Sequence, residues 1–204
     1  MGKTKADAVR RETEQRLIRL VTGDDAAIRG RLANLRRGAG RTPGDDPKVW
    51  GILFDGLPED MLGQHGLPSR EEWAIYTALT LYAVLQQGND PKQHRMHAEK
   101  ISLGRAAGKL AAATGGDESA RERVARRFHQ VVLAQDMAAM VYYLRSFIQL
   151  LRAQDIGLDI PMLARDLYLY QFPDGGASAR LQWGQDFYSN GTDENQEERK
   201  ENHE

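Results

Sequence analysis

Residues 69–88 read SREEWAIYTALTLYAVLQQG, and they predict a helix that lies at the centre of the molecule. Ser69 and Glu72 form a capping box, the S-x-x-E pattern in which each side chain satisfies a backbone N–H of the other residue. From Trp73 onward, apolar side chains occupy nearly every side of the predicted helix. A helix of that kind is buried on all faces rather than along one stripe. Gly88 ends the helix, because glycine is the usual stop signal after an apolar periodic segment. We therefore expect this helix to be central and buried.

The rest of the chain also carries helical signals. The further predicted helices are residues 7–22; one capped by Asp24 or Asp25 and stopped by Gly38; a short one from Pro47; residues 102–114; one from a capping box at Ser119 and Glu122; one capped by Asp136; one opened by Pro161; and a last one with Leu181, Trp183 and Phe187. We expect Trp183, Phe187 and Tyr188 to dock the last helix onto the body of the protein. No segment alternates as a strand does, so the predicted fold class is all-α, with eight or nine helices in two small helical bundles. The loop GNDPKQH divides residues 1–90, an N-terminal bundle, from residues 91–188, a C-terminal bundle.

Composition narrows the class of protein. The 204 residues include no cysteine, which excludes a disulfide framework, a thiol nucleophile and a thiolate metal site. The first fifteen residues are charged and show no signal peptide, and no run is long enough for a membrane span. These features favour a cytoplasmic protein. Residues 189–204 contain six acids and two bases, and we expect this acidic tail to be disordered.

Removing that tail leaves 26 basic and 23 acidic residues, a net charge of +3. The bases are grouped, because residues 26–43 hold five arginines and no acid. Arginine suits phosphate, since its planar fork donates two charge-assisted hydrogen bonds at once. The candidate nucleic-acid-binding residues lie beside the apolar stripes of four predicted helices and in one glycine-rich loop: Arg36, Arg37, Arg41, Arg105, Lys109, Arg123, Arg126, Arg127, Arg145 and Arg152. The alternative for each of them is a solvated helix face with internal ion pairs.

Catalytic signals are missing. His94 and His97 stand at i, i+3 with Glu99 nearby, but they fall in a loop without a third ligand, and we interpret them as structural or surface histidines. The sequence contains no P-loop, dinucleotide fingerprint, nucleophile elbow or HExxH motif. We therefore expect no enzymatic activity, no cofactor and no metal.

Seven short signatures occur in order along the chain. They are LRRG (35–38), ALTLYAVLQQG (78–88), SLGRA (102–106), VARRF (124–128), YLRSFIQLLR (143–152), DIPMLARDL (159–167) and RLQWGQDFY (180–188). Each is unspecific alone. Together and in this order they resemble the CasB-type small subunit of the type I-E CRISPR surveillance complex, Cascade.

The resemblance implies a small, all-helical, non-catalytic protein of antiviral defence. It implies two copies lying head to tail in the complex, where they bridge the subunits that hold the CRISPR RNA to the large subunit. It also implies that a basic face holds the displaced strand of the target DNA and stabilises the R-loop. Sequence specificity then comes from guide pairing, so this subunit needs only backbone contacts.

Two other classes stay open. One is a helical regulator that binds duplex DNA sequence-specifically, which needs an exposed basic recognition helix after a tight turn. The other is an enzyme with a carboxylate–histidine metal site inside a helical bundle, which needs Glu-x-x-His pairs on facing helices. No such pair is present in the sequence.

Overall fold

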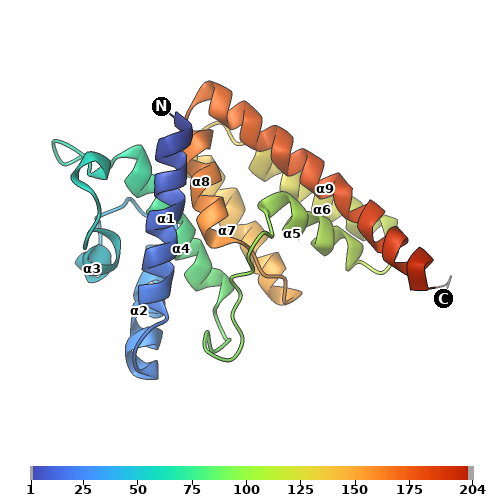
Figure 1. Ribbon diagram of the computed structural model, residues 1–204, viewed down its shortest axis with the longest axis horizontal. Helices are drawn as coiled ribbons and strands as arrows, with labels where there is room; N and C mark the ends of the chain where they lie inside the picture. Colours follow the sequence, from blue (N-terminus) through green and yellow to red (C-terminus); the bar gives the residue numbers. More distant parts are fainter. Residues whose placement is uncertain (1, 202–204) are drawn as a thin grey trace.

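The computed structural model describes residues 2–201, and it describes side chains for residues 4–189. The described chain folds into helices without a strand, as the sequence predicts (Figure 1). The α-helices are α1 (Gly2–Leu20), α2 (Asp25–Gly38), α3 (Trp50–Leu53), α4 (Arg70–Leu85), α5 (Leu103–Ala112), α6 (Glu118–Val132), α7 (Met137–Ala153), α8 (Ile160–Tyr170) and α9 (Pro173–Glu201). Two short 3-10 helices, Pro47–Val49 and Glu59–Met61, lie on either side of α3. The all-α prediction with eight or nine helices is confirmed.

Helix α4 is central, as its composition predicts. Every residue from Ala74 to Leu85 is buried, and α1, α2, α7 and α8 all pack against the helix. The predicted capping box is present: the Glu72 backbone N–H donates to Ser69 Oγ at 2.9 Å, and the Ser69 N–H donates to Glu72 Oε2 at 2.6 Å. The start of this helix is thus determined locally, while its buried surface holds the bundle together.

The capping box predicted at Ser119 is wrong. Helix α6 begins at Glu118, and its cap is Asp117, two positions before the predicted cap. The Asp117 carboxylate accepts a hydrogen bond from the Ala120 N–H at 3.1 Å. Ser119 instead donates its hydroxyl to Asp117 at 2.9 Å. An Asp is as good an N-cap as a Ser, and here it lies two positions closer to the glycine pair that ends the preceding segment.

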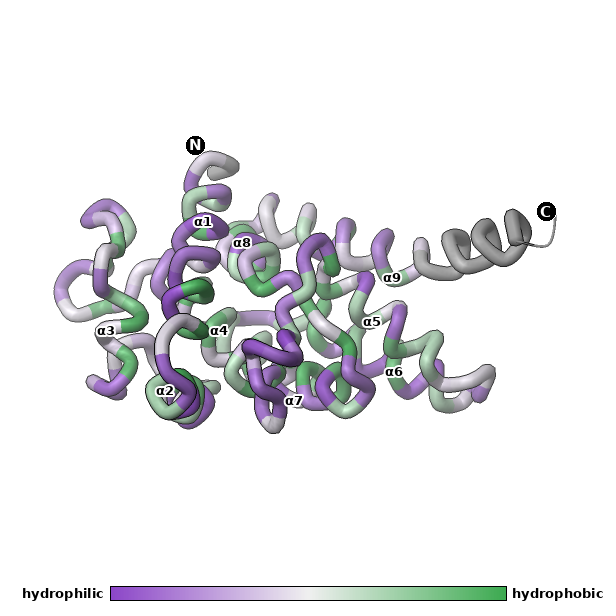
Figure 2. Tube along the Cα trace, turned by 60° about the horizontal axis from the view of Figure 1, so that its bottom comes forward, coloured by the Kyte–Doolittle hydropathy of each residue, from purple (hydrophilic) through white to green (hydrophobic). Residues whose placement is uncertain are grey.

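A single hydrophobic core extends through the described residues, from Ala6 in α1 to Phe187 in α9. Helix α8 packs on both α1 and α4, so the core joins segments that are far apart in sequence. The boundary predicted near residue 90 falls in the loop between α4 and α5, where most of residues 87–95 are exposed. The Cα trace in Figure 2 is coloured by the hydropathy of each residue along this loop. The division into two domains stays a prediction. The disordered tail predicted for residues 189–204 also stays a prediction, because the side chains of residues 190–204 lie outside the described part.

Helix α9 runs along α5 at one side of the molecule (Figure 1). Trp183 is fully buried there, and its indole N–H donates to Asp166 Oδ2 of α8 at 2.8 Å. Burial raises the pKa of the Asp166 carboxyl to about 6, although Arg165 lies 3.2 Å away. The predicted docking of the last helix through Trp183 and Phe187 is confirmed. No helix in the described part of the chain has the length and apolar character needed to cross a membrane.

The close approach of α5 to α9 depends on Gly104. A Cβ at this position would overlap the Trp183 carbonyl oxygen and lie 2.8 Å from Asp186 Cβ. We expect Gly104→Ala to lower the free energy of unfolding by about 1–3 kcal/mol, the usual cost of overpacking, in a urea titration. Gly30→Ala on α2 is the matched control, because its Cβ would meet nothing within 4 Å. The control is expected to gain about 0.5–1 kcal/mol from better helix propensity. Equal stability of the two variants would contradict this packing.

Candidate nucleic-acid interface

Five of the predicted cations lie on two adjacent helices. Helices α5 and α6 pack together, and the following residues are exposed on them: Arg105, Lys109, Arg123, Arg126 and Arg127. The amphipathic pattern explains their positions. Helix α6 buries Phe128 and Val131, while α5 buries Leu103 and Leu110, so the cations on the remaining arcs face solvent.

The arginines of α6 differ in their partners. The guanidinium of Arg123 donates to Ser119 Oγ at 2.8 Å and lies 3.7 Å from Asp117 Oδ2. This is an exposed ion pair of the kind that the alternative interpretation expects. In contrast, no ion pair joins Arg126 or Arg127 to any side chain between residues 4 and 189. We name the α5–α6 surface around Arg126 and Arg127 the α6 patch.

A second group of cations lies at the carboxyl end of α2. Arg36 and Arg37 are in the last turn, and exposed Arg41 follows in the loop. Helix α7 adds Arg145, whose Nη1 donates to the Ala39 carbonyl at 3.1 Å. Positive charge at a helix carboxyl end is favourable, because the last carbonyl groups carry partial negative charge. Arg145 therefore has a structural function at the end of α2, in the same segment that carries the other three.

The same helix end is held from a third direction. Tyr76 of α4 donates its hydroxyl to the Gly38 carbonyl at 2.8 Å, and burial raises the pKa of this phenol to about 12. Arg37 is in addition hydrogen-bonded to Asn34 within α2. We name Arg36, Arg37, Arg41 and Arg145 the α2 patch.

Arg152, in the last turn of α7, is half-buried. Among the described residues, no hydrogen bond or ion pair joins it to either patch.

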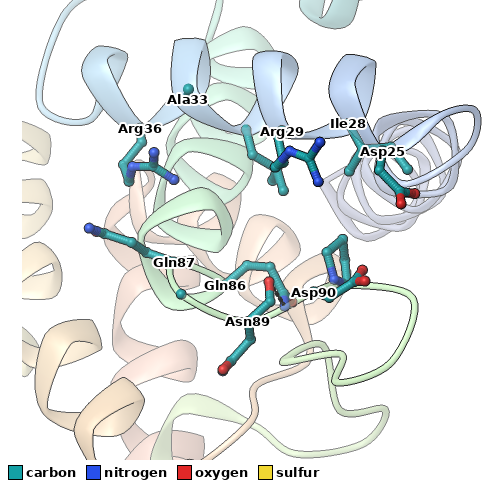
Figure 3. Close-up of a pocket in the computed structure, with 12 residues that line it drawn as sticks. Asp25, Ile28, Arg29, Ala33, Arg36, Gln86, Gln87, Asn89 and Asp90 are labelled. Carbon is teal, nitrogen blue, oxygen red and sulfur yellow. Dashed lines mark hydrogen bonds between the residues drawn. The ribbon is translucent and has the colours of Figure 1, made fainter.

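A cavity of about 440 Å³ lies between α2 and the loop that follows α4. Figure 3 shows Arg29 and Arg36 on its α2 wall, with Gln87 across from Arg36 and with Asp25 and Asp90 gathered at the other end. Arg29 is not among the binding residues predicted from the sequence. The signal was available, because residues seven apart, such as 29 and 36, share one face of a helix.

The acidic residues in the lining make this cavity less favourable for binding a polyanion. Asp25 pairs with Lys92 at 2.7 Å, which lowers the pKa of the Asp25 carboxyl. Two arginines and two aspartates line the cavity, so its lining is electrically balanced. Only its Arg36 end continues the α2 patch.

Not every arginine of the basic stretch at 26–43 is available to a ligand. Arg31 donates to the Leu20 carbonyl at 3.1 and 3.2 Å and fixes the turn between α1 and α2. It is a structural residue, as the alternative interpretation holds for some members of the cluster.

His94 and His97 fasten the loop after α4 to the loop before α8. His94 Nε2 lies 2.6 Å from Asp155 Oδ1, and His97 Nδ1 accepts a hydrogen bond from the Ile160 N–H at 3.2 Å. Burial lowers the pKa of His97. These contacts agree with the structural interpretation of both histidines. Among the described residues, no three His, Cys, Asp or Glu side chains are grouped so that they could hold a metal ion.

Fold and surface together define a class: small all-helical proteins that carry grouped cations on exposed helix faces. Comparison with known families identifies the family within this class, because residues 31–188 match the model of CRISPR-associated protein Cse2. The chain belongs to the CRISPR-associated Cse2 family, and the resemblance to the CasB-type small subunit is confirmed.

Solved structures agree with this assignment. The crystal structure of CasB from Thermobifida fusca is 31% identical to this chain, covers 92% of it and is itself covered over 98% of its length, with a TM-score of 0.65. The crystal structure of M. ruber CasB is 23% identical to this chain, covers 91% of it and is itself covered over 97% of its length. Its TM-score of 0.65 supports the shared fold. A search of curated protein sequences returns no match.

Proposed function

We propose that this chain is the non-catalytic small subunit of an RNA-guided surveillance complex, Cascade, and that its basic patches hold the backbone of the displaced DNA strand. The observation that carries the proposal is the α6 patch, where Arg126 and Arg127 are exposed and lack an ion pair with the described side chains. Leaving two such charges side by side costs self-repulsion, which a bound polyanion relieves.

The arrangement of the cations favours backbone contacts over base reading. The cations come from α2, α5, α6 and α7 rather than from one helix that fits a major groove. Guide pairing supplies the sequence specificity of such a complex, so phosphate contacts from several helices are sufficient. Membership of the Cse2 family supports this proposal.

We further propose that the subunit bridges others: a second copy of itself, the subunits that hold the CRISPR RNA, and the large subunit. Exposed apolar side chains support a bridging role. Among them are Trp50 and Leu67 in the first half of the chain and Leu133 and Tyr142 in its second half, with exposed fractions of 47%, 72%, 66% and 71%. Single exposed hydrophobic residues are also ordinary on the surface of a monomer. The bridging role is therefore tested by whether the subunit is incorporated into the complex, and not by the exposed area of these side chains.

The purified full-length protein is expected to bind single-stranded DNA weakly and without sequence preference. Each phosphate contact should add about −0.7 to the slope of log K against log salt concentration. Fluorescence anisotropy with oligonucleotides of scrambled sequence, measured at several salt concentrations, gives this slope. An association constant that does not change with salt would contradict the proposal. A strong preference for one duplex sequence would instead support the alternative function, a regulator that binds duplex DNA sequence-specifically, with α6 as its recognition helix.

A further inference from the structure

A slot opens between α5, α6 and α7, next to the α6 patch. Its cavity volume is about 310 Å³, and its apolar walls come from Leu110 of α5, Val124 of α6 and Leu150 of α7. Two small side chains, Ala120 and Ala153, also line it and leave the space open. A cavity of this size is at the lower end of the range for small-molecule sites, which are mostly apolar with a few polar groups.

The charge of the slot is one-sided. Arg123 and Arg127 line it, and no acidic side chain does so among the described residues. Arg123 is partly neutralised by Asp117, which lies 3.7 Å away outside the slot. Arg127 has no ion pair with the described side chains. This contrasts with the cavity beside α2, whose arginines are balanced by Asp25 and Asp90. The slot therefore favours a ligand that joins an apolar part to a negative charge.

The side-chain amide of Gln154 can form hydrogen bonds with a polar edge of a ligand in the slot. Gln154, which follows the last residue of α7, lines the slot, and its amide makes no hydrogen bond within the described part of the chain. A carboxamide both donates and accepts, which matches the mixed hydrogen-bonding edges of nucleobases. An unstacked nucleotide combines these properties: a flat ring for the apolar walls, a polar edge for Gln154 and a phosphate for Arg127.

We propose that this slot holds one unstacked base of a single-stranded nucleic acid whose phosphates lie on Arg123 and Arg127. The inference rests on the proposed function and adds a preference to it. A base in a duplex is stacked and paired, so it enters the slot only after unstacking, whereas a single strand offers its bases at small cost. The subunit thereby distinguishes a displaced strand from a duplex without reading its sequence.

The first test compares two single strands of equal length and charge, a homothymine strand and a fully abasic strand. Phosphate contacts alone give equal affinities. A base in the slot makes the wild-type protein bind the homothymine strand about tenfold more tightly, the size expected for burying one ring against apolar side chains. A strand with a single 2-aminopurine should also brighten on binding, because no aromatic side chain among the described residues lines the slot to quench it.

The second test fills the slot. Ala153→Leu, and separately Ala120→Leu, add apolar volume to its walls, and each should abolish the preference for the base-bearing strand while keeping the affinity for the abasic strand. Ala138→Leu is the matched control, because it adds the same volume at an exposed position in the first turn of α7, at the other end of that helix. The control should keep the preference. Far-ultraviolet circular dichroism confirms that each variant is folded.

The outcomes separate this inference from the proposed function. If wild-type protein binds both strands equally with a steep salt dependence, the proposed function stands and the base slot is wrong. If neither strand shows salt-dependent binding, both fail. If Ala153→Leu keeps its strand preference but no longer enters the assembled complex, the slot docks a side chain of another subunit, and the proposal is overturned.

Discussion

Reversing the two unpaired charges of the α6 patch is expected to weaken R-loop formation by the assembled complex without unfolding the subunit. Arg126→Glu combined with Arg127→Glu removes two phosphate contacts, each worth on the order of 1 kcal/mol, so the loss is roughly 30-fold in the binding equilibrium. The fold should survive, because both side chains are exposed and the buried stripe of α6 consists of Phe128 and Val131. Electrophoretic mobility of target DNA with reconstituted complex measures the effect.

Arg126 and Arg127 are a better pair for this experiment than Arg123 and Arg127. A glutamate at 123 would stand beside Asp117, the N-cap of α6, and would disturb the helix start as well as the patch. The matched control is Arg11→Glu with Lys48→Glu, which changes net charge equally at exposed positions outside both patches. Guide-RNA content should be normal in both double variants. Full R-loop formation by an incorporated, folded Arg126/Arg127 variant would exclude the α6 patch from the binding surface.

The largest expected effect on stability comes from Trp183. Its side chain is fully buried between α9 and the body and donates to Asp166 at 2.8 Å. Trp183→Ala leaves a large cavity, which costs about 3–5 kcal/mol. It also removes the N–H donor from a carboxylate that burial already disfavours, with its pKa raised to about 6. Urea denaturation at pH 7 gives the change in the free energy of unfolding.

Leu181→Ala is the control for that variant. Leu181 lies on the same helix, two residues away, but 63% of it is exposed. Its truncation should change stability by no more than about 0.5 kcal/mol, as is usual for surface positions. If the two variants are equally stable, α9 is not docked through Trp183.

Local chemistry explains which features of the fold could be predicted. Ser69 and Glu72 satisfy one another within a single turn, so their capping box could be identified from four residues. The failure at Ser119 has the same local origin, because two residues before it stands Asp117, an equally good cap. Tyr188 was expected to dock α9 together with Trp183 and Phe187, but it is 67% exposed. The apolar periodicity of a helix does not determine how far its buried stripe extends.

The candidate interface could be predicted less completely, because its partners come from distant segments. The exposure of Arg126 and Arg127 follows from the stripe of α6, and sequence periodicity predicts it correctly. The contact from Arg145 to the Ala39 carbonyl joins residues 106 positions apart, and no spacing rule could predict it. Nor could the sequence distinguish Arg31, which fixes a turn, from Arg36, which lies at the edge of a cavity.

Site-specific photo-crosslinking shows which molecule lies against the α6 patch in the assembled complex. A photoreactive amino acid replaces Arg126 in the full-length subunit, the complex is assembled on a target duplex with the two strands labelled differently, and the products are separated after irradiation. We expect a crosslink to the displaced strand that requires a matching guide RNA. Crosslinks only to protein, or only to the guide RNA, would contradict it.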